Sequence, residues 1–443
     1  MESDSSVNPW TPEEEGDHDP VMREWWTCEI LFQTKQDKRR WNLMTSFAYE
    51  QETPSCFFQY VLFDISSKKW VAHKDLNDVI SKLSHAKNRV NLRYETSRLE
   101  GLYPRYHLHV EDPTYELVVD AEYMARSLPH WIAQETTQGN LPIGLNFYRY
   151  GFLPNSEITG TLHLRNETYD IQGKGYLEHA FGNWSYQNPL QTLSGLHRTI
   201  STYGHLTKWW MSHHQFRIPK RIGLTSENNI FGYDWVWGVC DNDWSLFYGN
   251  SLFWISEGPS IGALYMTPDG KEYWEFCDVW FKYNKVLYVK EYDIYYPSDL
   301  ELTGRLGEKT VHLRFWSTTE SYKYIDPYKK GRFYKAYILS ELPGRMEGTF
   351  TEKDKIIQLQ GDCKIVPLRQ APLLGHNAVT IKFLRPPKGV GLSVEFDSHA
   401  LQKRLLAQVQ LAPRPKVCCH LNRIYLSKIP KESEFQKDIE AED

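Results

Sequence analysis

"LPNSEITGTLHLRNETYDIQG", residues 153–173, has a counterpart later in the chain in "LPGRMEGTFTEKDKIIQLQG", residues 342–361. Each copy begins with Leu-Pro, reaches Gly-Thr, and ends in an aliphatic residue, a glutamine and a glycine. Alternating apolar and polar residues on either side of a polar centre are typical of a β-hairpin. A hairpin that recurs after about half the chain predicts two tandem domains of similar design.

Tryptophan-rich segments open both halves of the chain, "REWWTCEILF" at 23–32 and "GYDWVWGVCD" at 232–241. Much of the remaining sequence alternates like a strand, and helical periodicity is confined to residues 75–86 and 397–409. The pattern predicts an all-β protein of two tandem antiparallel β-barrels with few helices. The expected divisions are a flexible N-terminus at 1–19, a first barrel at 20–190, a linker at 191–229, a second barrel at 230–370, and a C-terminal extension with a charged tail at 371–443.

The composition restricts the classes of partner. A net charge of -5 over 443 residues offers no basic excess to bind phosphates, so no nucleic-acid partner is expected. The chain has no apolar run of membrane-spanning length and no secretion signal at its acidic N-terminus, which predicts a cytoplasmic protein. The 7 cysteines are scattered without a C-x-x-C pair, which favours reduced thiols over disulfides or a zinc site.

Aromatic residues are abundant, with 16 Trp, 28 Tyr and 20 Phe. They favour strands, and they also line pockets for elongated apolar ligands, so a hydrophobic small molecule is the expected partner. Trp209 and Trp210, next to Lys208, predict either contact with a membrane surface or packing between the barrels.

The segment that follows the first hairpin, "GKGYLEHAFGNW" at 173–184, carries the candidate chemistry. The second copy continues as "GDCKIVP" from residue 361. Continued past each hairpin, the alignment places Tyr176, Glu178 and His179 against Lys364, Val366 and Pro367. A phenol, a carboxyl and an imidazole that occur in one copy only are not needed to close a barrel. Their role is therefore local to the first barrel or to its interface with the second.

On a strand, alternate side chains share a face, so Tyr176 and Glu178 are expected on one face and Leu177 and His179 on the other. A carboxyl group in apolar surroundings keeps its proton near neutral pH and can protonate an alkene, and a tyrosine can hold the acid or a water. Aromatic faces stabilise the resulting cation. The alternative is structural: Glu178 forms a salt bridge at the barrel mouth, and His179 caps a loop through a backbone carbonyl.

These segments resemble the carotenoid 1,2-hydratase (hydroxyneurosporene synthase) and AttH-like superfamily, whose motif is Gly-x-Gly/Ala-Tyr/Trp-x-Asp-His-x-Trp-Gly. The resemblance covers roughly residues 20–370 and implies tandem lipocalin-like barrels. It matches Tyr176 to the aromatic position, Glu178 to the aspartate, His179 to the histidine and Gly182 to the glycine of the motif. Glutamate replaces aspartate here, and Phe181 stands where tryptophan is usual. The hydratases' upstream His-x-Trp element has no match, and the nearest segment is "NFYRYGF" at 146–152.

Two functions follow as hypotheses. The first is a cofactor-free enzyme that hydrates, isomerises or cyclises an isoprenoid or polyketide, a hydratase or an isomerase of the type that the resemblance implies. Glu178 would be its general acid, Tyr176 the partner of the acid, and His179 the residue that orients it. The second is a non-catalytic protein that binds a lipid or isoprenoid in the same cavity. In both, the expected ligand-binding aromatics are Trp25, Trp26, Tyr148, Tyr150, Trp184 and Trp235, and neither a metal nor an organic cofactor is expected.

Overall fold

The computed structural model describes residues 10–134, 139–143, 146–183, 232–251, 255–292, 294–327 and 334–372. It also describes residues 204, 208, 212 and 223–224 and several short strands between 383 and 421. The elements are almost all β-strands, as predicted. The short exceptions include α1 (Pro12–Glu15), a single helical turn, and η1 (Ile80–Lys82), a 3-10 turn. Among the described residues, no helix is long and apolar enough to cross a membrane.

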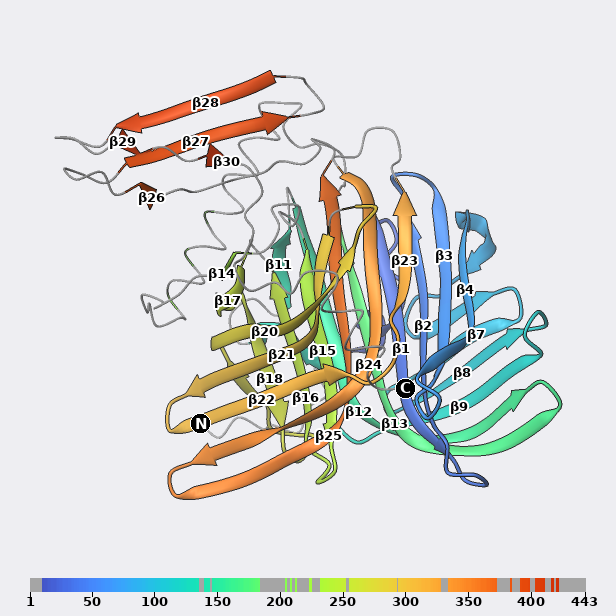
Figure 1. Ribbon diagram of the computed structural model, residues 1–443. Helices are drawn as coiled ribbons and strands as arrows, with labels where there is room; N and C mark the ends of the chain where they lie inside the picture. The colour runs from blue at the N-terminus through green and yellow to red at the C-terminus, as the bar shows by residue number, and fades with distance from the viewer. Residues whose placement is uncertain are drawn as a thin grey trace.

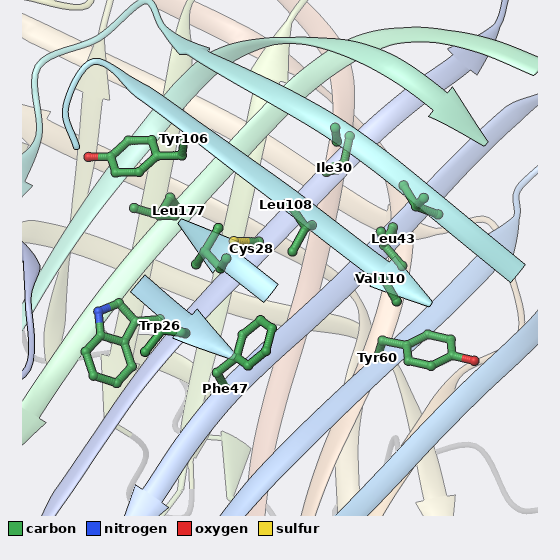
Figure 2. Packing of buried hydrophobic residues seen from close by; sticks show 14 of the residues in the cluster. Trp26, Cys28, Ile30, Leu43, Phe47, Tyr60, Tyr106, Leu108, Val110 and Leu177 are labelled. Atoms are coloured by element: carbon green, nitrogen blue, oxygen red, sulfur yellow. The ribbon is translucent and has the colours of Figure 1, made fainter. Parts of the chain in front are cut away.

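The first barrel is an antiparallel sheet that curls around its own core (Figure 1). Its strands are β1 (Arg23–Thr34), β2 (Arg40–Glu50), β3 (Ser55–Asp64), β4 (Lys69–Val79), β5 (Leu83–Ser84), β6 (Val90–Tyr94), β7 (Ser97–Leu102), β8 (Arg105–Asp112), β9 (Leu117–Ala125), β10 (His130–Trp131), β11 (Asn140–Ile143), β12 (Asn146–Leu164) and β13 (Glu167–Gly182). The order in the sheet is β4-β3-β2-β1-β13-β12-β9-β8-β7-β6-β5, and β10 and β11 both pair with β12. Side chains such as Trp26, Phe47 and Leu108 fill the interior (Figure 2).

The second barrel repeats this design. Its strands are β14 (Gly223–Leu224), β15 (Tyr233–Cys240), β16 (Ser245–Ser251), β17 (Ile255–Pro259), β18 (Gly262–Thr267), β19 (Trp274–Phe276), β20 (Asp278–Val289), β21 (Ile294–Leu306), β22 (Lys309–Ser317), β23 (Tyr322–Pro327), β24 (Tyr334–Glu352) and β25 (Lys355–Pro372). The order is β14-β17-β20-β21-β22-β24-β25-β15-β16-β18-β19, and β23 pairs with β24. The opening strand of each barrel, β1 or β15, therefore pairs with the second strand of the repeated hairpin, β13 or β25.

The repeated hairpins agree in detail. Both have two-residue loops, and Arg165 and Lys353 have positive φ angles of 55° and 54° at the same loop position. Gly160 and Gly348 both lie against the backbone of the neighbouring strand: an added Cβ would be 1.9 Å from the carbonyl oxygen of Asp120 in the first barrel and 2.0 Å from that of His312 in the second. In each barrel the repeated glycine therefore lets its strand approach the neighbouring strand closely, β12 against β9 and β24 against β22.

Two predicted helices are wrong. Residues 75–86 belong to the exposed end of β4, to η1 and to β5, and residues 397–409 overlap β27 and β28. The C-terminal strands form a third sheet of β26 (Phe383–Leu384), β27 (Gly391–Ser398), β28 (Lys403–Gln410), β29 (Lys416–Val417) and β30 (His420–Leu421). At the end of edge strand β4, Asp78 is partly buried and Val79 is exposed, so the polar and apolar residues do not follow the alternation of a strand.

The N-terminal segment was expected to be flexible, but its described part, residues 10–19, is packed against the first barrel. Trp10 lies 5.5 Å from Trp131 between ring centroids. Buried Glu15 accepts hydrogen bonds from the Tyr103 backbone N–H at 3.0 Å and from the Tyr106 hydroxyl at 2.9 Å. These partners lie in β8, in the turn before it and in β10, far away in the sequence, so local sequence could not reveal them.

The two barrels meet face to face through a layer of aromatic side chains, called here the barrel interface. It joins β1, β12 and β13 of the first barrel to β15, β16, β18 and β25 of the second (Figure 1). Its buried members are Leu31, Tyr150, Phe152, Tyr176, Ala180, Trp235, Trp237, Val239, Phe247, Ala263, Tyr265 and Val366. The aromatic excess of the sequence is therefore used in part to join the barrels.

Candidate functional site

Strand β13 divides its candidate residues between two environments, as the alternation predicts. Tyr176 belongs to the barrel interface, whereas Leu177 belongs to the core of the first barrel. Glu178 follows Tyr176 toward the interface, and His179 follows Leu177 toward the side of Trp26, with which it stacks at 4.6 Å. Neighbouring residues of one motif thus take part in different clusters.

Glu178 is 7% exposed and is surrounded by hydrogen-bond donors from both barrels. Its Oε1 atom accepts from the Trp25 indole N–H at 3.0 Å. Its Oε2 atom accepts from the Trp235 indole N–H at 3.1 Å and contacts the hydroxyl groups of Tyr176, at 3.0 Å, and Tyr150. We call these five residues the Glu178 cluster. Because Trp235 comes from the second barrel, the cluster exists only where the barrels meet.

The oxygen atoms of the Glu178 cluster indicate where a proton is needed. The Tyr150 and Tyr176 hydroxyl oxygens are 2.9 Å apart, and both contact Oε2 of Glu178. All three contacts can be full hydrogen bonds at once only if three hydrogen atoms are present, and the two tyrosines supply only two. A protonated Glu178 completes the ring, whereas an ionised Glu178 leaves one contact without a hydrogen atom. The geometry therefore fits a neutral carboxyl group.

Burial acts in the same direction. It raises the pKa of Glu178 above its ordinary value, although hydrogen bonds from Tyr150, Trp25 and Tyr176 oppose the shift. Within the described part of the chain, no lysine, arginine or histidine forms an ion pair with this carboxyl. The salt bridge that the structural alternative expects is therefore not found among these residues.

His179 serves a different purpose from the one expected. Its Nδ1 atom lies 3.0 Å from the Glu14 carbonyl oxygen, and its Nε2 atom lies 2.7 Å from Glu24 Oε1. Both nitrogens thus hold the N-terminal segment and β1, on the face of β13 opposite Glu178. The prediction that His179 orients Glu178 is corrected, since these contacts leave no nitrogen for that role. Capping of a backbone carbonyl, the alternative reading, is what the structure shows.

The surroundings of His179 include the one group of potential metal ligands found among the described residues. Ligand atoms of His18, Glu24 and His179 lie within 4.8 Å of one another. His18 Nδ1 is 2.8 Å from Glu24 Oε1, and the Tyr49 hydroxyl donates to Glu24 Oε2 at 2.6 Å. Burial lowers the pKa of His179, although the hydrogen bond to Glu24 and its charge oppose the shift. As it stands, the group is a hydrogen-bonded anchor for residues 14–18.

The other predicted ligand-binding residues fall into three groups. Trp25, Tyr150 and Trp235 touch Glu178, and partly buried Tyr148 lies 6.2 Å from Tyr150 between ring centroids. Trp26 does not join them: it is fully buried in the core of the first barrel, because alternate residues of β1 face opposite sides. Trp184 lies outside the described residues.

Sequence reasoning missed a second buried polar group at the barrel interface. Lys364, fully buried, places Nζ 3.0 Å from Glu341 Oε2, 3.4 Å from Glu29 Oε2 and 2.6 Å from Asn42 Oδ1. We call these four residues the Lys364 cluster. Burial raises the pKa of Glu29 to about 8, although Lys364 opposes the shift. The alignment of Lys364 with Tyr176 was the available signal, but the partners of Lys364 could not be read from it.

The chain is similar to known proteins in its structure, whereas sequence comparisons find no match. No family model matches the chain. No curated protein matches it either. An AttH-like protein from Nitrosomonas europaea is similar in structure, with a TM-score of 0.55, 12% identity, and coverage of 81% of this chain and 95% of the other. Kievitone hydratase from Nectria haematococca gives a TM-score of 0.52, 10% identity, and coverage of 81% and 91%. The chain therefore has the tandem lipocalin-like fold of these proteins, which is the fold that its motif implied.

Proposed function

We propose that the protein binds an elongated apolar molecule at the barrel interface and that Glu178 acts on it as a general acid. The observation that carries this proposal is the Glu178 cluster: a buried carboxyl with only neutral hydrogen-bond donors around it and an oxygen ring that needs its proton. Trp25 and Tyr148 are only partly buried, so an apolar molecule would reach the carboxyl from their side. The known kievitone hydratase is a precedent for a hydratase on this fold.

The chemistry needs no group beyond these side chains. The Glu178 O–H proton is transferred to one carbon of a carbon–carbon double bond, the π electrons form the new C–H bond, and the other carbon becomes a cation. The ring faces of Tyr150, Tyr176 and Trp235 stabilise the cation by cation–π attraction. Water then adds with loss of a proton, or a second double bond attacks, or a neighbouring C–H bond loses its proton. After attack by a second double bond, the new cation in turn loses a C–H proton or adds water with loss of a proton. In each case one proton returns to Glu178, so the acid is regenerated.

The alternative is that the same interface binds an apolar molecule without changing it. Tyr150 and Tyr176 would then fix Glu178 as a neutral hydrogen-bonding group rather than as a proton donor. The two functions differ in one respect: only the enzyme releases a ligand that differs from the one that entered.

The experiment combines native mass spectrometry with a pair of variants. Protein purified from cells is examined for a bound apolar molecule, and lipid extract incubated with the protein is examined for products that are isomers of a component or one water heavier. Glu178→Gln is expected to retain binding and to lose turnover by a factor of about 100 or more. Glu29→Gln, a second buried carboxyl at the same interface, is the matched control and keeps turnover. Equal turnover by wild type and Glu178→Gln would refute the acid role.

A further inference from the structure

His130 is a buried histidine at the barrel interface that no part of the proposed mechanism uses. It is 8% exposed, and its Nε2 atom is fully enclosed without a hydrogen-bond partner. The tyrosines that touch its ring use their hydroxyl groups elsewhere: Tyr265 accepts from the Ala133 backbone N–H at 2.8 Å, and Tyr273 donates to the Leu128 carbonyl at 2.5 Å. The imidazole therefore presents a free nitrogen in the layer that contains Glu178.

The sheet places His130 in line with the candidate acid. Glu178 on β13 is directly opposite Phe152 on β12, and Phe152 is directly opposite His130 on β10. Directly opposed residues of antiparallel strands point to the same face, so both polar groups face the second barrel on either side of Phe152. Two strand spacings separate their Cα atoms by roughly 10 Å.

The surroundings of His130 are aromatic. Its ring stacks on Tyr273 at 4.2 Å and lies 5.6 Å from Phe152 between ring centroids. Burial lowers the pKa of His130 to about 3, so the ring is neutral, with one nitrogen as donor and the other as acceptor. An enclosed polar atom without a partner is unfavourable, and an oxygen atom of a bound molecule would restore the missing hydrogen bond.

We infer that His130 is a specificity-determining residue that binds an oxygen atom of the ligand at the barrel interface. The ligand is then an elongated apolar molecule that carries a hydroxyl or carbonyl group within about two strand spacings of the double bond that Glu178 protonates. This inference rests on the proposed function, because it requires an apolar ligand between Glu178 and His130. It adds the requirement for the oxygen atom and the position of that atom.

Calorimetric titration with two probes tests the inference. The probes are geranylgeraniol and the hydrocarbon of the same skeleton that lacks the hydroxyl group. Wild type is expected to bind the alcohol about tenfold more tightly, as one hydrogen bond to a buried group provides. His130→Phe keeps an aromatic ring at this position but removes the nitrogens. The variant is therefore expected to bind both probes equally, with the affinity that wild type has for the hydrocarbon. His163→Phe, at a partly exposed histidine of β12 that lies outside the barrel interface, is the control and keeps the preference.

A second measurement uses the wild-type protein, so its result does not depend on whether His130→Phe folds. In wild type labelled with ¹⁵N in its histidine rings, the ring signals of His130 are identified as the non-titrating signals that are missing in His130→Asn. The alcohol is expected to shift these signals. The hydrocarbon is expected to leave them in place. Equal affinity of wild type for both probes, a preference retained by His130→Phe, or unshifted ring signals would overturn the inference and leave the proposed acid intact. Failure of wild type to bind either probe would overturn the inference and the proposed ligand site together.

Discussion

Strands β13 and β25 hold equivalent places in the two barrels but present different chemistry to the interface between them. β13 contributes Tyr176 and Glu178, whereas β25 contributes Lys364 and Val366 at the aligned positions. Lys364 is surrounded by carboxylates and an amide, so its charge is matched. Glu178 is surrounded by indole and phenol groups, which carry no charge.

The difference separates two uses of a buried ionisable group. A group that joins two domains is compensated by opposite charge, because an unpaired buried charge is strongly unfavourable. A carboxyl group that must give up and recover a proton has uncharged neighbours, which favour its neutral, protonated form. By this comparison the Lys364 cluster joins the barrels, and the Glu178 cluster is available for chemistry. The predictions below test that division of roles.

The largest effect on stability is expected for Lys364→Met. The substitution leaves the carboxyl groups of Glu29 and Glu341 buried without their cation, which costs about 3–5 kcal/mol of unfolding free energy. Urea denaturation measures the loss, and the double variant Glu29→Gln/Lys364→Met should recover part of it. A loss below about 1 kcal/mol in the single variant would show that the Lys364 cluster does not join the barrels.

A smaller effect is expected at the repeated glycines. In Gly160→Ala and Gly348→Ala the new Cβ atom meets a backbone carbonyl oxygen of the neighbouring strand, at 1.9 Å and 2.0 Å before any adjustment. Each variant should lose about 1–3 kcal/mol, with an added contribution from backbone strain at Gly160, whose φ angle is 156°. A larger loss for Gly348→Ala than for Gly160→Ala, measured by the same denaturation, would show that the equivalent hairpins differ in their contribution to stability.

A dependence of stability on pH is also expected, and Glu29 contributes it. Its pKa is raised by burial from 4.5 to about 8 in the folded protein. A raised carboxyl pKa contributes stability that is present below the unfolded value of 4.5 and is lost as pH rises through about 8. The urea midpoint of wild type should therefore fall across this range, and Glu29→Gln should fall less. An identical pH profile for both proteins would contradict the raised pKa.

Much of the fold follows from local patterns, because strand alternation and hairpin composition are properties of neighbouring residues. The repeat of residues 153–173 at 342–361 predicts the pair β12–β13 and its equivalent β24–β25, and the i, i+2 rule places Tyr176 beside Glu178. Alternation also misleads where a strand is exposed. Residues 75–86 resemble a helix because, at the end of edge strand β4, polar Asp78 is partly buried and apolar Val79 is exposed, against the alternation of a strand.

The site could be predicted only in part, because its partners come from other strands and from the second barrel. Trp235 reaches Glu178 across the interface, and Lys364 reaches Glu29 in the same way. The position of His130 depends on the register of β10 against β12, which local sequence does not fix. The acidic segment 10–19 looked disordered by composition, yet the Tyr103 backbone N–H and the Tyr106 hydroxyl donate to Glu15.

The protonation state of Glu178 tests the central claim most directly. A ¹³C NMR titration of the glutamate side-chain carboxyl carbons, with the signal of Glu178 identified by its loss in Glu178→Gln, measures this state without knowledge of the ligand. The expected result is a midpoint above the ordinary value of 4.5, as burial and the oxygen ring with Tyr150 and Tyr176 require. A midpoint well below neutral pH would mean that Glu178 is ionised at neutral pH, and the proposed acid would be contradicted.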